Sequence, residues 1–439
     1  VRRQRQMCIR DRIFGSSTDS MEGILADAAS KAVPELVVFI VYDLPNRDCH
    51  AKASNGELCC SYKADGRCDY LDVGDGKCSA GLKQYEEEYI DKIAEVLRTY
   101  SGLVPIVLVI EPDSLPNLST NQADPRCGND ATKSAYQDGV SYAVKALAAA
   151  DPYAAIYLDG GHGGWLGWKD NMKDFVQTIV GLGVSDHIRG FASNVAGYQH
   201  VGELCPTYDF CLNNAHPQHP CCSDPCGLTG KWNPSHNELQ YALHLRKAMK
   251  EAMPGFRPHM IIDTGRNGVA GMRDDCANWC NIRGAGVGLV ATTDTAKPSV
   301  VDAYFWLKTP GESDGCTQTL PDGGSCPRFD EDCASADSIG SRYDEPRAPE
   351  AGQWFDYQIK QLAANARLYE GTPPPTETET ETSTSSAAGT SVESTEPTSS
   401  APVGSTRPPR PRPRGNPFKD KVFYVNPSYK TSLTASIQT

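Results

Sequence analysis

Short aliphatic runs alternate with amphipathic helical segments along most of this chain, and nearly every run ends in a polar residue. The clearest run, at 104–110, is followed at once by Glu111-Pro112-Asp113. Such runs are typical of strands buried on both faces of a parallel sheet, and their alternation with helices indicates successive βα units. The sequence therefore predicts an α/β fold, either a parallel barrel or a doubly wound sheet. Polar residues at so many strand ends favour the barrel, which gathers them at one face.

The same pattern sets the bounds of the expected elements. Strands are expected at 36–42, 104–110, 154–158, 188–193, 259–262, 287–291 and 303–307. Helices are expected at 20–32, 84–99, 133–150, 172–182, 236–253 and 352–365. The segment 84–99 has the strongest helical spacing of apolar residues.

Composition excludes some classes of protein. The 55 acidic residues outnumber the 42 basic ones, which leaves a net charge of -13. That balance argues against a nucleic-acid binder, because such proteins need a basic face. No run is long and apolar enough to predict a membrane span. The 17 cysteines are unusual for a reducing compartment and indicate a secreted protein with disulfide bonds.

Composition also divides the chain into four parts. Residues 1–12 have neither an initiating Met nor an apolar signal-peptide core, and we interpret them as an unrelated or artefactual leader. The alternating pattern predicts one folded domain at 13–370. Residues 371–414 are rich in Thr, Ser and Pro and predict an O-glycosylated linker. Residues 415–439 look ordered again, and we interpret them as the truncated start of a second domain.

Two of the strand ends carry carboxylates that are suited to acid–base chemistry. One run ends near Asp43 and Asp48, and the other ends at Asp113. Pro112 stiffens the exit from its strand, so Asp113 should project from a rigid element. Two such ends predict general acid–base catalysis at one cleft. From this motif alone, Asp113 could equally be the N-cap of a helix or a turn residue.

Eight blocks of the chain, in order, resemble glycoside hydrolase family 6, the cellobiohydrolases and endoglucanases that act on β-1,4-glucan. The blocks are YDLPNRDC at 42–49, ASNGE at 53–57, IEPDSL at 110–115, YLDGGHGGWLGW at 157–168, SNVA at 193–196, DTGRNG at 263–268, WCN at 279–281 and KTPGESDG at 308–315. The resemblance implies a distorted, partly open parallel (β/α) barrel whose active site is a tunnel or cleft. Family members carry a segment and a first barrel strand before the helix expected at Ser20. The catalytic domain at 13–370 is therefore expected to lack that strand, and 415–439 resembles the start of the same segment in a second copy.

The resemblance also implies roles for five residues in an inverting hydrolysis. Asp113 matches the general acid, and Asp48 matches the partner that raises its pKa and stabilises an oxocarbenium ion. Asp314 matches either the base or a residue that only positions water or sugar. Ser54 matches a residue that holds water in an indirect route. Tyr42 matches a ring that crowds the sugar at the cleavage site, with an ordinary barrel tyrosine as the alternative.

Sugar binding is expected from aromatic faces, on which the CH groups of a pyranose pack, and from polar groups that bind its hydroxyls. Trp165 and Trp168 match platforms on the leaving-group side, and Trp279 matches one on the non-reducing side. A role in the core is the alternative for each tryptophan. The implied hydroxyl partners are Lys308, Glu312, Asp159, His162 and Asn194.

Two disulfide bonds follow from the resemblance, Cys49–Cys127 and Cys280–Cys333. The other cysteines fall in clusters, one of which includes His216 and His219, so a zinc site is an alternative there. Their spacing does not fit a regular zinc finger, and we favour disulfide bonds with the pairing left open. No metal and no organic cofactor is expected.

Two long segments, 46–83 and 309–353, look able to roof a tunnel. Together with the resemblance, they predict a secreted cellobiohydrolase that works from the non-reducing end of cellulose. Cellulose and cello-oligosaccharides are the expected partners, and the chain is expected to be a monomer within a multidomain enzyme. The alternatives are a family 6 endoglucanase and a catalytically impaired fragment that binds glucan.

Overall fold

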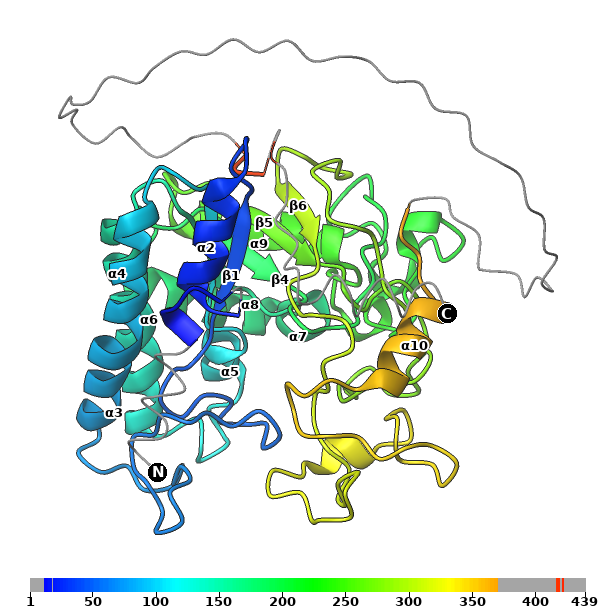
Figure 1. The fold of residues 1–439 in the computed structure, drawn as a ribbon. Coiled ribbons are helices and arrows are strands. Elements are labelled where there is room, and N and C mark those ends of the chain that lie inside the picture. Colours follow the sequence, from blue (N-terminus) through cyan, green and yellow to red (C-terminus); the bar gives the residue numbers. More distant parts are fainter. Residues whose placement is uncertain (1–11, 18, 370–415, 419–420, 422–439) are drawn as a thin grey trace, which may run out of the picture.

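A computed structural model describes residues 12–17, 19–369, 416–418 and 421. Its single sheet has six parallel strands, each paired with the next one in sequence. The sheet curls into a half-barrel with helices packed on its outer side (Figure 1), so the predicted fold class is confirmed. The strands are β1 (Val37–Val41), β2 (Ile106–Ile110), β3 (Ala155–Asp159), β4 (Gly190–Ser193), β5 (His259–Asp263) and β6 (Val301–Phe305).

Three of the α-helices begin at a capping side chain supplied by the sequence. Ser20, Asn129 and Asn237 each accept a hydrogen bond from a backbone N–H of the first helical turn. The α-helices are α2 (Met21–Ser30), α3 (Ser79–Gln84), α4 (Asp91–Tyr100), α5 (Ser114–Thr120), α6 (Asp130–Ala150), α7 (Gly163–Leu166), α8 (Lys169–Leu182), α9 (Glu238–Ala252) and α10 (Asp356–Ala364). A π-helical turn, η1 (Tyr85–Ile90), joins α3 to α4, and 3₁₀ turns lie at η2 (Leu212–Asn214), η3 (Pro220–Cys222), η4 (Thr229–Lys231) and η5 (Glu331–Ala334).

The strand predicted at 287–291 is wrong. The backbone N–H of Val287 donates to the Leu362 carbonyl and that of Val290 donates to the Leu368 carbonyl. These groups therefore bond to the end of α10 and the residues after it instead of to a neighbouring strand. The run is apolar because it packs there: Val287 shares a buried cluster with Ile359 and Leu362. The short helices α5 and α7 were not predicted from the sequence.

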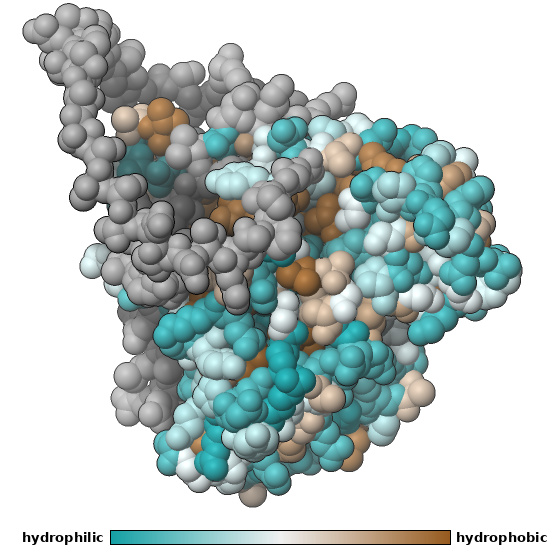
Figure 2. All heavy atoms as spheres, turned by 90° about the vertical axis from the view of Figure 1, so that its right-hand side faces the viewer, coloured by the Kyte–Doolittle hydropathy of each residue, from teal (hydrophilic) through white to brown (hydrophobic). Residues whose placement is uncertain are grey.

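The sheet has an apolar layer on each face. Ile106, Leu108 and Ile110 of β2 pack with the outer helices, whereas Val107 and Val109 face the inner side. This alternation explains the uninterrupted aliphatic run, since both faces of the strand are covered. Figure 2 looks from the right-hand side of Figure 1 and shows apolar residues near the middle of an otherwise largely hydrophilic face.

The inner face also holds a residue from far along the chain. Phe418 is 1% exposed and belongs to the inner-face cluster. Its ring centroid lies 6.4 Å from that of Tyr157 on β3 and 6.2 Å from that of Phe305 on β6. Asn416 anchors the segment, because its side-chain amide donates to the Asp302 carbonyl at 2.7 Å. The remaining residues of the predicted second domain, except Lys421, lie outside the described residues.

Eight disulfide bonds join 16 of the cysteines. The two implied by the resemblance, Cys49–Cys127 and Cys280–Cys333, are confirmed. The cysteines considered for zinc are bonded to each other or to a neighbouring loop, as the disulfide alternative predicted, and Cys8 lies outside the described residues. The other six bonds are Cys59–Cys68, Cys60–Cys78, Cys205–Cys221, Cys211–Cys222, Cys226–Cys276 and Cys316–Cys326. Within the described part of the chain, every helix is too short or too polar to cross a bilayer.

Candidate active site

Asp113 follows β2 in a left-handed backbone conformation, with φ of 62°. It occupies the N-cap position of α5, but its side chain makes no capping hydrogen bond. Its backbone N–H donates to Oδ2 of Asp159, at the end of β3, at 3.0 Å. A non-glycine residue in this conformation is uncommon, and such residues gather at functional sites. The carboxyl group of Asp113 is therefore free of the capping role that the motif alone left open.

The surroundings of Asp113 favour the protonated form of its carboxyl group. Loss of hydration raises its pKa well above the ordinary value, and the neighbouring carboxylates of Asp48 and Asp159 raise it further. Asp159 is itself buried, and burial raises its pKa to about 7. A carboxylic acid that holds its proton near neutral pH can act as a general acid.

Asp48 lies beside this acid, after β1, and is 2% exposed. Its carboxylate accepts hydrogen bonds from the hydroxyl groups of Tyr42 and Ser54. Burial raises the pKa of Asp48, while the Arg47 guanidinium opposes that rise. Arg47 also lies over the Tyr42 ring, 4.1 Å from its centroid. The structure thus brings together four of the five predicted catalytic residues: Tyr42, Asp48, Ser54 and Asp113.

Asp314, the fifth, is ionised and held by four donors. Arg266 Nη1 lies 2.6 Å from Oδ2, the Asn281 N–H 2.8 Å and the Tyr198 hydroxyl 3.0 Å. Lys308 Nζ lies 3.3 Å from Oδ1. Burial alone would raise the pKa of Asp314, but Arg266 and Lys308 outweigh it and hold the pKa below its ordinary value. The Asp314 charge in turn helps to raise the pKa of Asp113.

Three residues of this arrangement were not predicted: Arg47, Arg266 and Tyr198. Arg47 and Arg266 lie inside the matched blocks at 42–49 and 263–268. Each could have been proposed as a site residue because it is a charged residue within a matched block. Tyr198 lies outside every block, and no sequence pattern marks it. Its partner is known only from the fold, because 116 residues separate it from Asp314.

The three predicted sugar platforms are half-buried. Each indole N–H donates to a protein oxygen that fixes the plane of the ring. Trp165 donates to the Thr120 hydroxyl at 2.8 Å, Trp168 to the Lys231 carbonyl at 3.0 Å, and Trp279 to Asp332 Oδ2 at 2.9 Å. A fixed ring that keeps part of its surface accessible is suited to stacking against sugar.

The predicted hydroxyl partners differ in how much of each side chain is still available. The Asn194 amide is occupied by protein groups, since it donates to the Gln199 and Asp263 carbonyls and accepts from the Gln199 N–H. Asp159 is engaged by the Asp113 N–H, so both residues position this edge of the sheet. His162 Nδ1, in contrast, is buried and has no hydrogen-bond partner among the described residues. Burial lowers the pKa of His162 to about 3, so the ring is neutral. Burial also raises the pKa of Glu312.

The family model for glycosyl hydrolases family 6 matches residues 12–366. The chain belongs to this family. It is 37% identical over 355 residues to the 1,4-beta-D-glucan cellobiohydrolase CEL6C of Podospora anserina, covering 80% of this chain and 75% of that protein. It is 38% identical over 348 residues to Exoglucanase 3 of Agaricus bisporus, covering 78% of this chain and 66% of that protein.

Solved structures agree with this assignment. The catalytic core of the cellobiohydrolase Cel6A from Chaetomium thermophilum matches with a TM-score of 0.62 at 34% identity, over 80% of this chain and 84% of that chain. Cellobiohydrolase II from Humicola insolens, in complex with glucose and cellotetraose, matches with a TM-score of 0.61 at 32% identity, over 79% of this chain and 82% of that chain. The protein is thus a family 6 glycosidase.

The two long loops of this family 6 glycosidase, which carry Asp48, Ser54 and Asp314, contact each other. From the loop at 46–83, the Lys52 N–H donates to Asp330 Oδ2 at 2.6 Å and Arg67 Nη1 donates to the Pro327 carbonyl at 3.4 Å. From the other loop, Arg328 Nη1 donates to the Asn55 carbonyl at 3.5 Å. Disulfide bonds within each loop, Cys59–Cys68 and Cys316–Cys326 among them, limit the conformations that each loop can adopt. Both loops lie at the same end of the barrel in Figure 1, below the carboxyl ends of the strands.

Proposed function

We propose that this family 6 glycosidase is an inverting cellobiohydrolase, which releases cellobiose from the non-reducing ends of β-1,4-glucan chains. The observation that carries the proposal is the place of Asp113 at the end of β2, where its carboxyl group is buried beside Asp48 and Asp159. Burial and these two neighbours raise the pKa of Asp113, which favours its protonated form. A carboxylic acid that keeps its proton beside a second carboxylate is what acid-assisted glycoside cleavage requires.

In this mechanism, Asp113 donates its proton to the glycosidic oxygen as the bond to the anomeric carbon breaks. The Tyr42 ring crowds the sugar at that point and favours its distortion. The Asp48 carboxylate, next to both, stabilises the positive charge that develops on the sugar ring. A water molecule attacks from the opposite face of the ring, which inverts the configuration.

For the attacking water, we propose the indirect route through Ser54 and Asp48. The four donors on Asp314 make it a weak base, and a base works best when its pKa lies near the working pH. Asp314 then serves to hold Lys308 and Arg266 in place beside the sugar. Ser54 is bonded to Asp48, whose raised pKa makes it the better acceptor of a proton.

The contact between the two loops supports exo action over endo action. A site covered by loops that touch and are internally cross-linked admits a chain end more readily than the middle of a chain. Relatives named cellobiohydrolase and exoglucanase point the same way. The eight disulfide bonds support secretion, because such bonds persist in oxidising surroundings. Action as a monomer within a multidomain enzyme, with a linker at 371–414 and a further domain from 415, is part of the same proposal.

Two measurements test the function. We expect crystalline cellulose to yield mainly cellobiose, while carboxymethylcellulose loses little viscosity; a steep fall in viscosity would favour the endoglucanase alternative. Nuclear magnetic resonance of the first product should show the α-anomer.

The Asp113→Asn variant tests the enzyme itself on cellotetraose. We expect its rate to fall about a hundredfold to ten-thousandfold with binding retained, which is the usual effect of removing a general acid. Equal rates for the variant and the unmodified protein would instead support a fragment that binds glucan without cutting it.

A further inference from the structure

Trp232 is the most exposed of the six tryptophans, with 66% of its surface accessible. Single exposed apolar residues are common and need no explanation by themselves. Trp232 differs from them because one of its neighbours in sequence bonds to the predicted platform Trp168 and the other bonds to α7, the helix that carries Trp165. The Lys231 carbonyl accepts the Trp168 indole N–H at 3.0 Å. The Asn233 side chain donates to the carbonyl of Gly163, the first residue of α7, at 2.8 Å.

The backbone at Trp232 is held in an unusual conformation. Its φ is 62°, in the left-handed region that large side chains seldom adopt. The Trp232 N–H closes the 3₁₀ turn η4 by donating to the Thr229 carbonyl at 3.2 Å. Asp224 fixes the start of that turn, because its carboxylate accepts the N–H groups of Leu228 and Thr229. The indole is thus presented from a defined turn.

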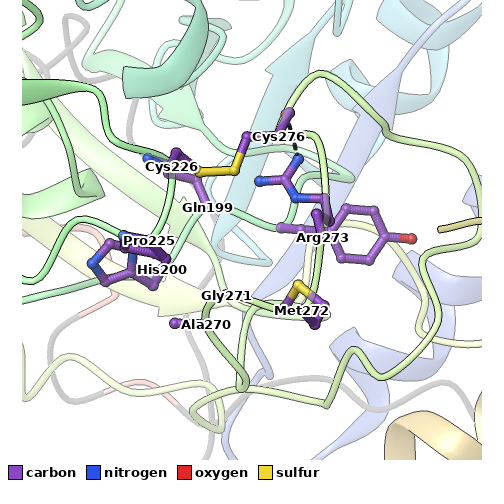
Figure 3. A pocket seen from close by; sticks show the side chains of 10 residues that line it. Gln199, His200, Pro225, Cys226, Ala270, Gly271, Met272, Arg273 and Cys276 are labelled. Carbon is purple, nitrogen blue, oxygen red and sulfur yellow. Dashed lines mark hydrogen bonds between the residues drawn. A yellow bond between two sulfur atoms is a disulfide. The ribbon is translucent and has the colours of Figure 1, made fainter. Parts of the chain in front are cut away.

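The segment that carries this turn is strongly cross-linked. Cys205–Cys221 and Cys211–Cys222 close it on itself. Cys226–Cys276 ties it to the loop around Arg273, as Figure 3 shows. Arg273 Nη1 donates in turn to the Cys276 carbonyl at 2.8 Å. An aromatic ring on such a support can bind a ligand without the entropy cost of ordering a loop.

We propose that Trp232 is an outer sugar platform, which extends the leaving-group side of the cleft beyond Trp168 for β-1,4-glucan chains. The bonds of its two neighbours place Trp232 beside Trp168 and α7, so its indole can extend the surface that Trp165 and Trp168 offer a chain. The exposed indole face would then pack against the CH groups of a further pyranose. The inference rests on the proposed function, because it takes the chain direction from the roles of Trp165 and Trp168.

The test measures affinity against chain length. Soluble cello-oligosaccharides of increasing length are titrated calorimetrically into the Asp113→Asn protein, with and without Trp232→Ala. We expect equal affinity for the shortest oligosaccharides. For the longest soluble ones, we expect affinity about five- to tenfold weaker in Trp232→Ala and partly restored in Trp232→Phe. The control is Tyr343→Ala, which removes an aromatic residue that is fully exposed on the loop at 309–353.

Each outcome bears on the inference separately from the function. Affinities that match at every length, or that fall equally at every length, would overturn the role of Trp232. If the unmodified protein fails to hydrolyse cellotetraose, the proposed function fails whatever Trp232 does. Both proposals stand if two results are obtained together. Trp232→Ala, unlike Tyr343→Ala, binds the long oligosaccharides more weakly, and the unmodified protein hydrolyses cellotetraose.

Discussion

Replacing Glu238 by glutamine should remove one contribution to the fall in the free energy of unfolding as the pH rises. Glu238 is the first residue of α9 and is fully buried. Its Oε1 accepts the N–H of Gly163, where α7 begins, at 2.9 Å. Burial raises the pKa of its carboxyl group from 4.5 to about 8. Glutamine keeps the shape of the protonated side chain and the acceptor for Gly163.

The sign follows from proton binding. Between pH 4.5 and about 8 the folded protein keeps a proton on Glu238 that the unfolded chain has lost. The free energy of unfolding therefore falls as the pH rises through that window. Each pH unit costs about 1.4 kcal/mol, so the full effect at pH 8 is at most about 5 kcal/mol. Below pH 4.5 both states are protonated, and Glu238→Gln should be close to neutral.

The assay is denaturant unfolding at pH 4.5, 6 and 8 with the disulfide bonds intact. Other buried carboxyl groups with raised pKa values, such as Glu111, lower the stability of both proteins in the same way, so the difference between them isolates Glu238. Glu251→Gln, an exposed position on the same helix, is the matched control. The reasoning is refuted if Glu238→Gln and Glu251→Gln lose the same stability between pH 4.5 and pH 8.

Three further predictions concern the barrel, the base and the loops. Phe418→Ala should lower the free energy of unfolding by about 3–5 kcal/mol, because it empties a fully buried position; a change below about 1 kcal/mol by denaturant titration would contradict the packing. Asp314→Ala should lower turnover without rescue by added azide, since we do not assign it as the direct base; restored turnover would reverse that assignment. Asp330→Ala, which removes the acceptor of the Lys52 N–H, should raise the ratio of internal cuts to cellobiose release, and an unchanged product ratio would count against a roof that restricts entry.

Much of the fold could be predicted from the sequence, because periodicity is a local property. The run before Glu111 had to be a strand buried on both faces, and the residues after it had to lie at a sheet edge. The segment at 287–291 is also apolar, yet the N–H groups of Val287 and Val290 bond to the end of α10 and the residues after it, which no local pattern reveals. Helix propensity also did not show α7, whose four residues begin at two adjacent glycines.

The site was predictable in part for the same reason. Asp48 and Asp113 follow strands and lie in blocks that resemble the family, so their proximity could be expected. Arg266 and Lys308 both contact Asp314 and lower its pKa. These contacts depend on side-chain directions, which only the packed structure defines. The pairing of the additional cysteines is likewise a matter of distances in space, since many pairings fit one set of spacings.

The place of Phe418 has a consequence for how the chain would respond to proteolysis. The chain leaves the described barrel at Tyr369 and is in contact with it again at Asn416 and Phe418. The covalent backbone from Tyr369 to Asn416, together with the contacts of Asn416 and Phe418 with the barrel, therefore forms a closed ring. A protease that cuts once between these points would leave the tail held only by the Asn416 hydrogen bond and the Phe418 contact. These contacts are too few to offset the cost of associating two separate chains, so gel filtration should separate the tail from the barrel.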